Sequence, residues 1–176
     1  MLRTSRHALI AVIAAAILCL AAPSIASACP GGDDELAAGS VRSSEAVTFC
    51  LINQERTTRG LRALRRNKRL DLASRRHARS MAARNFFAHG NFVGRIKSAR
   101  YLQGARGWRL GENIAWGSGV LGTPEEIVDS WMHSPGHRAN ILSRGFREIG
   151  VGIAYGTPSG SYGDGGTYVT DFGTRG

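Results

Sequence analysis

The alternation of residue size near the C-terminus constrains the fold of this chain more than any other feature. From residue 149 to 155, large apolar residues alternate with glycine or alanine, and this period of two predicts a β-strand. A loop with five glycines, over 156–166, leads to a closing strand predicted over 167–172. The earlier segments carry helical spacing instead, so helices come early and strands late. We therefore predict an α+β fold in which helices cover an antiparallel sheet.

Three helices are predicted in the first half of the chain. The first begins at a cap formed by Ser43 or Ser44 and ends at Gly60, whose lack of a side chain suits a C-terminal cap. A second covers about 69–84, and a short third lies near 95–101 among glycine-rich turns.

Two further helices are predicted around Pro135. The run Thr-Pro-Glu-Glu at 123–126 supplies a cap, a proline at the first helical position and two acids in the first turn. Because Pro135 disfavours helical backbone before it, this helix should stop near His133, and Ser134 should cap a second, short helix. The segment 111–117 just upstream is predicted as either a strand or a helical turn.

Residues 1–28 have the composition of a secretory signal peptide. Arg3 and Arg6 precede an apolar run over 8–22, and a small-residue cleavage signature covers 26–28. The run is short and rich in alanine for a spanning helix, which needs about 20 apolar residues. We therefore expect a secreted, extracellular protein that is not transmembrane after processing and is associated with the cell envelope or the medium.

Two cysteines remain in the mature chain. Cys29 and Cys50 most simply form one disulfide in an oxidising compartment. Cys29 also follows the cleavage site directly, which leaves lipid attachment open, although Ala26 stands where a lipid-attachment box usually has leucine. Residues 29–42 are small and polar and predict a flexible tether, so a single domain is expected over 43–176.

Arginine dominates the charge of the chain. Without the signal peptide, 21 basic residues face 13 acidic ones, a net charge of +8. No nucleic-acid motif accompanies this charge, so an anionic envelope polymer is the expected partner of a basic face. A solvated helix face in an arginine-biased protein is an equally open interpretation. The basic residues gather in one part of the chain: Arg62, Arg65, Arg66, Lys68, Arg69, Arg75, Arg76, Arg79 and Arg84.

Chemistry-bearing residues gather between Gly111 and Leu142, with His89 outside this stretch. The predicted third position of a helix disfavours a protonated His137. Together with His89 and Glu112, it matches the ligand types of a zinc site, although the HExxH spacing is absent. His77 lies on the apolar face of its helix and is expected to be a core or rim histidine.

Serine, histidine and glutamate also supply the residue types of a hydrolase triad. Ser134 is better explained as a helix cap, because no GxSxG turn is present to expose its hydroxyl. Four aromatic residues are expected to line the polar cluster: Phe86, Phe87, Trp116 and Trp131.

These segments together resemble the CAP superfamily (cysteine-rich secretory proteins, antigen 5 and plant pathogenesis-related proteins), and its bacterial SCP-like extracellular branch in particular. The resemblance covers about residues 47–173 in the family's order. It is carried by LINQERTTRGL, LRRNKRLDLASRRHARSMAARNFFAHG, GENIAWG, IVDSWMHSPGHRANIL, FREIGVGIAYG and YVTDFG.

The resemblance implies a three-layer α-β-α sandwich with a central antiparallel sheet and a cleft on one side. Its cleft histidines map to His89 and His137, and its GENIA acid maps to Glu112. The fourth position, an acid in eukaryotic members, falls on Ser134. Loss of that anion weakens the expectation of a divalent, zinc-like metal held by His89 and His137.

The family has no common reaction, so the resemblance does not identify a chemistry. We predict a monomeric, non-catalytic binding protein that takes a lipid or cell-wall ligand through a His-Glu-His cleft. The alternative is a metal-assisted, peptidase-like hydrolase that uses the same cleft. A third hypothesis is a wall-interaction module that works through the arginine face.

Overall fold

The structure, a computed structural model, describes residues 29–159 and 164–176. In chain order its elements are α1 (Val41–Thr57), β1 (Arg65–Arg66), α2 (Lys68–Arg84), α3 (Phe92–Ser98), β2 (Trp108–Gly117), the 3₁₀ helix η1 (Gly119–Gly122), α4 (Pro124–His133), α5 (Pro135–Ile141), β3 (Glu148–Tyr155) and β4 (Gly166–Arg175). None of the helices within the described ranges is long and apolar enough to cross a membrane. The predicted signal peptide, residues 1–28, lies outside these ranges.

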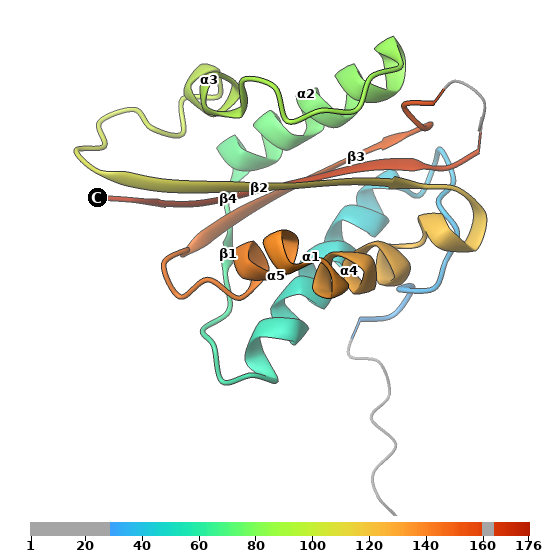
Figure 1. The fold of residues 1–176 in the computed structure, drawn as a ribbon, viewed down its shortest axis with the longest axis horizontal. Coiled ribbons are helices and arrows are strands. Elements are labelled where there is room, and N and C mark those ends of the chain that lie inside the picture. The colour runs from blue at the N-terminus through green and yellow to red at the C-terminus, as the bar shows by residue number, and fades with distance from the viewer. Residues whose placement is uncertain (1–28, 160–163) are drawn as a thin grey trace, which may run out of the picture.

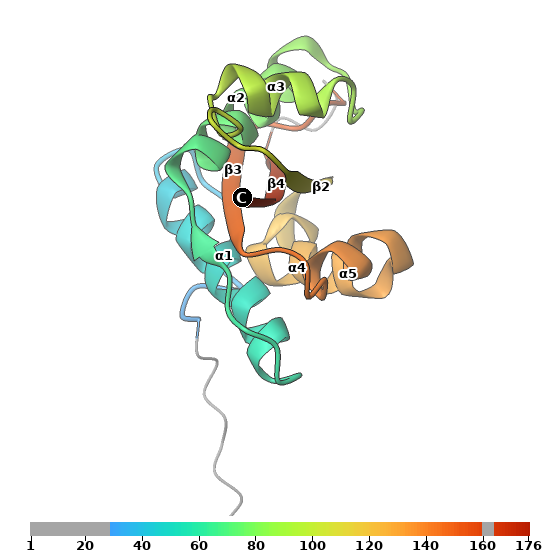
Figure 2. The same ribbon diagram turned by 90° about the vertical axis from the view of Figure 1, so that its left-hand side faces the viewer.

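The elements form three layers (Figures 1 and 2). Helices α2 and α3 cover one face of the sheet, and α1, α4 and α5 cover the other. This arrangement confirms the predicted α-β-α sandwich. The strand order is β1-β3-β4-β2, with β4 antiparallel to both of its neighbours. The sheet is mixed rather than wholly antiparallel, because the two-residue strand β1 runs parallel to β3.

Strand β3 explains how the sheet can be covered on both sides. Ile149, Val151 and Ile153 are each at most 1% exposed and join the larger core, which also contains residues of α1, α4 and α5. Its other face carries Gly150 and Gly152 against α2. A Cβ atom on Gly150 would lie 2.1 Å from the carbonyl carbon of Leu70, so the helix backbone rests directly on the strand backbone.

Carboxylates continue the hydrogen bonding of β3 beyond the short strand β1. The Val151 N–H donates to Asp71 Oδ1 over 2.9 Å, and the Ile153 N–H donates to Glu45 Oε1 over 3.4 Å. Arg66 donates to both Asp71 and Glu45. Arg75 Nε donates to Glu45 Oε1 over 2.7 Å, and the guanidinium of Arg75 lies beside Asp71. Two members of the arginine run therefore stabilise the sheet edge and are not free to form a binding face.

Most predicted element boundaries are confirmed within a few residues. Helix α4 begins at Pro124, and the Thr123 hydroxyl accepts from the Glu126 N–H over 3.3 Å. The segment 111–117 is strand throughout. The first helix starts earlier than predicted, with Ser40 rather than Ser43 or Ser44 at its N-cap. The short third helix covers Phe92–Ser98 instead of 95–101 because the Asn91 side chain caps it.

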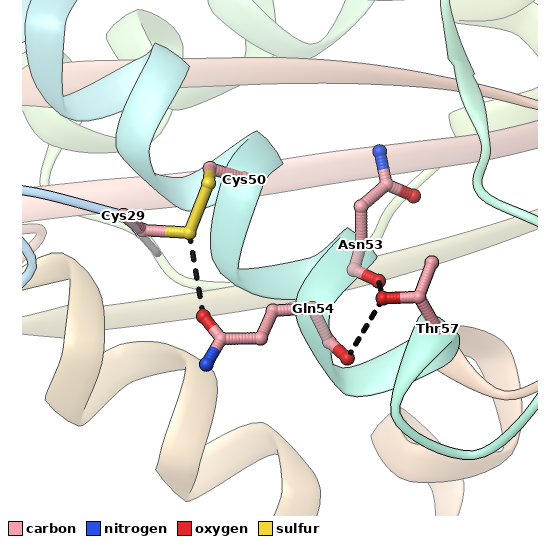
Figure 3. Close-up of a disulfide and its surroundings, with 5 residues drawn as sticks. All are labelled: Cys29, Cys50, Asn53, Gln54 and Thr57. Atoms are coloured by element: carbon pink, nitrogen blue, oxygen red, sulfur yellow. Dashed lines mark hydrogen bonds between the residues drawn. A yellow bond between two sulfur atoms is a disulfide. The ribbon is translucent and has the colours of Figure 1, made fainter. Parts of the chain in front are cut away.

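The segment before α1, expected to be a tether, lies against the domain. Cys29 is 2% exposed and forms a disulfide with Cys50 on α1, which confirms the predicted pairing (Figure 3). Leu36 is also buried, and the Gly32 carbonyl accepts from the Glu125 N–H at the start of α4 over 2.8 Å. The disulfide and these contacts join residues 29–40 to the layer formed by α1 and α4.

Gly150→Ala should strongly destabilise the domain. The added methyl group meets helix backbone that cannot move without separating α2 from β3, and overpacking of this kind costs about 3 kcal/mol. Urea denaturation monitored by tryptophan fluorescence would measure the loss. Gly107→Ala is the matched control, since nothing lies within 4 Å of its added Cβ. Equal stability of the two variants would contradict the close contact.

Replacing Cys29 and Cys50 together with serine should lower the free energy of unfolding by about 3 kcal/mol, the loop-closure contribution of a loop this long. The two residues are 21 positions apart. Denaturant unfolding of the oxidised wild type and the double variant measures the difference, and a reductant should lower only the wild-type value. A reductant-insensitive wild type would contradict the bond.

Candidate functional site

Three polar side chains, those of His89, Arg95 and Glu112, contact one another at the outer edge of the sheet, along strand β2. A fourth, that of His137, lies near enough for the charge of His89 to lower its pKa. His89, Arg95, Glu112 and His137 are called the β2-edge site below. His89 and Arg95 come from the segment around α3, on one side of the sheet, whereas His137 comes from α5, on the other side. Glu112 lies on the strand between them. The site therefore joins three segments that are far apart in the sequence.

Glu112 is the centre of the site. Its side chain is 1% exposed, and Oε1 lies 2.8 Å from His89 Nδ1. Because an ionised carboxylate only accepts hydrogen bonds, this contact places the proton on His89 Nδ1. Arg95 Nη2 donates to the second oxygen, Oε2. Both carboxylate oxygens are therefore engaged, while the His89 side chain remains 51% exposed and presents its other edge to solvent.

The backbone after α2 sets the position of His89. Asn85 follows the last residue of α2 as its C-cap, and its left-handed φ of 51° turns the chain. His77 Nε2 lies 2.9 Å from the Ala88 carbonyl, and Arg95 Nη1 donates to the His89 carbonyl over 2.7 Å. His77 is 3% exposed, which confirms its prediction as an interior histidine. Burial, followed by the charge of Arg95, lowers its pKa.

An amide pair holds α5 and His137 against the strand. The Asn113 side chain donates to the His137 carbonyl over 3.1 Å. Asn140 Nδ2 donates to Asn113 Oδ1 over 2.9 Å and to the Glu112 carbonyl over 3.2 Å. Burial lowers the pKa of His137, and the charge of His89 lowers it further. His137 is therefore held toward its neutral form beside a histidine that contacts a carboxylate.

A second carboxyl group lies behind Glu112. Asp171 on β4 is the direct cross-strand partner of Glu112 and is 1% exposed. Its Oδ2 accepts from Ser74 Oγ on α2 over 2.8 Å. Burial and then the neighbouring Glu112 charge raise the pKa of Asp171 well above its ordinary value. Asp171 therefore holds its proton more tightly than an exposed carboxyl group does, and it lies beside Glu112 in the sheet.

The structure places Ser134 and the four predicted aromatic residues in different surroundings. Ser134 occupies the N-cap of α5, but its hydroxyl makes no capping hydrogen bond; its carbonyl accepts from the Arg138 N–H over 2.8 Å instead. Trp131 is a core residue, 1% exposed, because its indole N–H donates to the Ile114 carbonyl over 3.2 Å. Phe86 is half-buried, whereas Phe87 and Trp116 remain exposed.

The contacts of the β2-edge site do not fit the predicted divalent metal. Among the described residues, no three His, Cys, Asp or Glu side chains are grouped as metal ligands. Glu112, the carboxyl group beside the histidines, already has its two oxygens in contact with His89 and Arg95. The guanidinium of Arg95 also places a positive charge where a cation would have to bind, and like charges repel.

Sequence reasoning missed Arg95, Asp171 and the two asparagines. Arg95 lies in a glycine-rich segment without periodicity, so nothing in the sequence directs it to Glu112. Asp171 gave a signal that could have been used, because it is a lone acid in an otherwise apolar and hydroxyl-bearing strand. A charged residue in such a strand needs a partner, and only the register of β2 and β4 identifies that partner.

Comparison with known proteins finds similarity over most of the chain. The model of the cysteine-rich secretory protein family (CAP) matches residues 49–172. The uncharacterized protein YkwD of Bacillus subtilis (strain 168) is 38% identical over 121 residues, which make up 66% of this chain and 44% of YkwD. The chain thus spans less than half the length of that relative.

Solved structures share the fold at low identity. An extracellular protein containing an SCP domain from Bacillus anthracis aligns with a TM-score of 0.62 at 23% identity, over 78% of this chain and 43% of that one. An outer surface protein from Borrelia burgdorferi aligns with a TM-score of 0.63 at 20% identity, over 77% of this chain and 96% of that one.

Asp171→Asn should change how stability depends on pH. The raised pKa of Asp171 means that the folded state keeps a proton which the unfolded chain loses above its ordinary pKa of 3.8. Wild-type stability should therefore fall as the pH rises from about 4 to 8 relative to the variant, whose amide still accepts from Ser74. Denaturant unfolding at several pH values measures this slope. Parallel curves for the two proteins would contradict a raised pKa of Asp171.

Proposed function

Since this chain belongs to the cysteine-rich secretory protein (CAP) family, we propose that it is an exported binding protein whose β2-edge site takes a polar fragment of the cell envelope. Three observations support export. The first 28 residues have a signal-peptide composition. Cys29 and Cys50 form a disulfide, which suits an oxidising compartment. Similar solved structures are described as an extracellular protein and an outer surface protein.

The engagement of Glu112 is the observation that carries the proposal of binding over catalysis. For Glu112 to act as a general base, one of its carboxylate oxygens must be open to the proton that it abstracts. Here His89 and Arg95 contact the two oxygens of Glu112. Within the described residues, no hydrogen bond activates the Ser134 hydroxyl. The arrangement instead presents the exposed edge of His89, the Arg95 guanidinium and His137 as fixed donors and acceptors.

The polarity of the site favours a wall fragment over a lipid chain. With Trp131 in the core, the aromatic surface expected for a lipid is reduced to exposed or half-buried rings. A cavity of about 330 Å³ between α2 and α3 adjoins the site through Arg95, and its other lining residues are Ala73, Arg76, Asn91, Gly94 and Ser98. Hydroxyl, amide and carboxylate groups of a sugar-peptide fragment match these side chains.

Binding of defined muropeptides to the purified protein, measured by calorimetry, tests this function. His89→Ala and Arg95→Gln should each weaken binding about tenfold, because each removes a hydrogen bond that involves a charged group. His133→Ala is the matched control, since its side chain is 78% exposed on α4. It should bind as wild type does.

Several outcomes would contradict the proposal. They are the absence of saturable muropeptide binding by the wild type, equal weakening by the His133 control, and hydrolysis of the muropeptide that is lost in the His89 variant. The last result, together with stoichiometric metal in the purified protein, would favour the alternative of a metal-assisted hydrolase.

A further inference from the structure

A second concave surface lies where the C-terminal end of α1 meets the loop between α5 and β3. Its cavity has a volume of about 330 Å³ and is called the arginine pocket below. The lining residues are Arg56, Gly60, Leu61, Arg62, Arg144 and Arg147. Four of these six residues are arginines and none is acidic. The arginine pocket shares no residue with the β2-edge site.

Arg56 forms the base of the arginine pocket. It is only 1% exposed, although it carries a guanidinium group. Its Nε donates to the Arg62 carbonyl over 3.0 Å, and its Nη1 donates to the carbonyls of Ile141 and Ser143 over 2.6 and 3.0 Å. These bonds close the C-terminal end of α5. Within the described part of the chain, Nη2 has no acceptor, and Arg56 is among the residues that line the cavity.

Among the residues that the structure describes, the four arginines of the pocket have no carboxylate partner. The ion pairs formed by the described residues join other arginines to acids, as Arg66 and Arg75 are joined to Glu45. None of these pairs involves a residue of the arginine pocket. Arg147 Nη1 donates to the loop carbonyls of Arg144 and Phe146, and the side chains of Arg62 and Arg144 are exposed.

This gathering of like charges is unfavourable without a counter-ion. Removal of a guanidinium from water costs free energy unless an opposite charge replaces the water. Burial lowers the pKa of Arg56, and the charge of Arg147 lowers it further, so the two cations act on each other. The hydrogen bonds to the carbonyls at the end of α5 explain why the guanidinium of Arg56 is buried at this place. They do not account for the three other arginines around the cavity.

We propose that the arginine pocket binds the phosphate group of a phosphate ester. Guanidinium groups bind phosphate with paired N–H donors, which gives short, charge-assisted hydrogen bonds. A volume near 330 Å³ is at the lower end for small-molecule sites and exceeds what a bare phosphate fills. A glycerol phosphate unit, from an envelope polymer or from a lipid headgroup, has both the charge and a size suited to the cavity.

The test uses Arg62→Gln/Arg144→Gln, which removes two exposed arginines of the pocket and leaves the buried Arg56 in place. Arg79→Gln/Arg106→Gln is the matched control, because both side chains are exposed elsewhere and the charge change is the same. Binding of glycerol 3-phosphate is measured by calorimetry at fixed ionic strength. Thermal unfolding of each variant confirms that the fold is kept.

Wild type and control should bind glycerol 3-phosphate with similar affinity, and the pocket variant should bind at least about tenfold more weakly. A second arm uses phosphatidylcholine vesicles with and without phosphatidylglycerol. Tighter binding to the anionic vesicles, lost in the pocket variant, assigns the phosphate to a lipid headgroup. Binding of glycerol 3-phosphate without vesicle binding assigns it to a soluble or polymeric ester. No saturable binding by the wild type, or equal loss in the control, would overturn the proposal.

Discussion

The direct contact between the backbones of α2 and β3 determines much of this structure. Gly150 and Gly152 leave no side chain between the helix and the sheet. The Ser74 hydroxyl of α2 therefore reaches both the Gly150 carbonyl, over 3.3 Å, and the Asp171 carboxyl group on the next strand. Asp171 in turn faces Glu112 across the sheet. Close packing in the interior thus helps to set the geometry of the β2-edge site.

Both edges of the sheet are closed by side chains of neighbouring helices. On β3, the carboxylates of Glu45 and Asp71 accept backbone N–H groups. On β2, Trp131 and Asn140 donate to the carbonyls of Ile114 and Glu112. These bonds satisfy backbone groups that would otherwise be left at an open edge, which is a common site of unwanted strand pairing. At β2 they also join α4 and α5 to the strand that carries Glu112.

Two groups of arginines in this chain differ in their partners. Some arginines neutralise buried carboxylates: Arg66 and Arg75 serve Glu45 and Asp71, and Arg95 serves Glu112. The residues of the arginine pocket have no such partner among the described side chains. The run of basic residues in the sequence does not separate these two groups, because pairing depends on which helix face meets which carboxylate. A basic region in sequence is therefore not equivalent to a basic surface.

The sequence by itself predicted the fold class, most element boundaries, the Cys29–Cys50 disulfide and the candidate site residues His89, Glu112 and His137. These follow from local rules: period, capping residues, proline placement and a family motif. Only the tertiary structure decided that Arg95 and Asp171 flank Glu112, that Trp131 is buried and that the Ser134 hydroxyl does not cap its helix. Each of these depends on contacts between segments distant in the chain, such as the pairing of residue 112 with residue 171. The local periodicity of a strand does not specify its partner or its register.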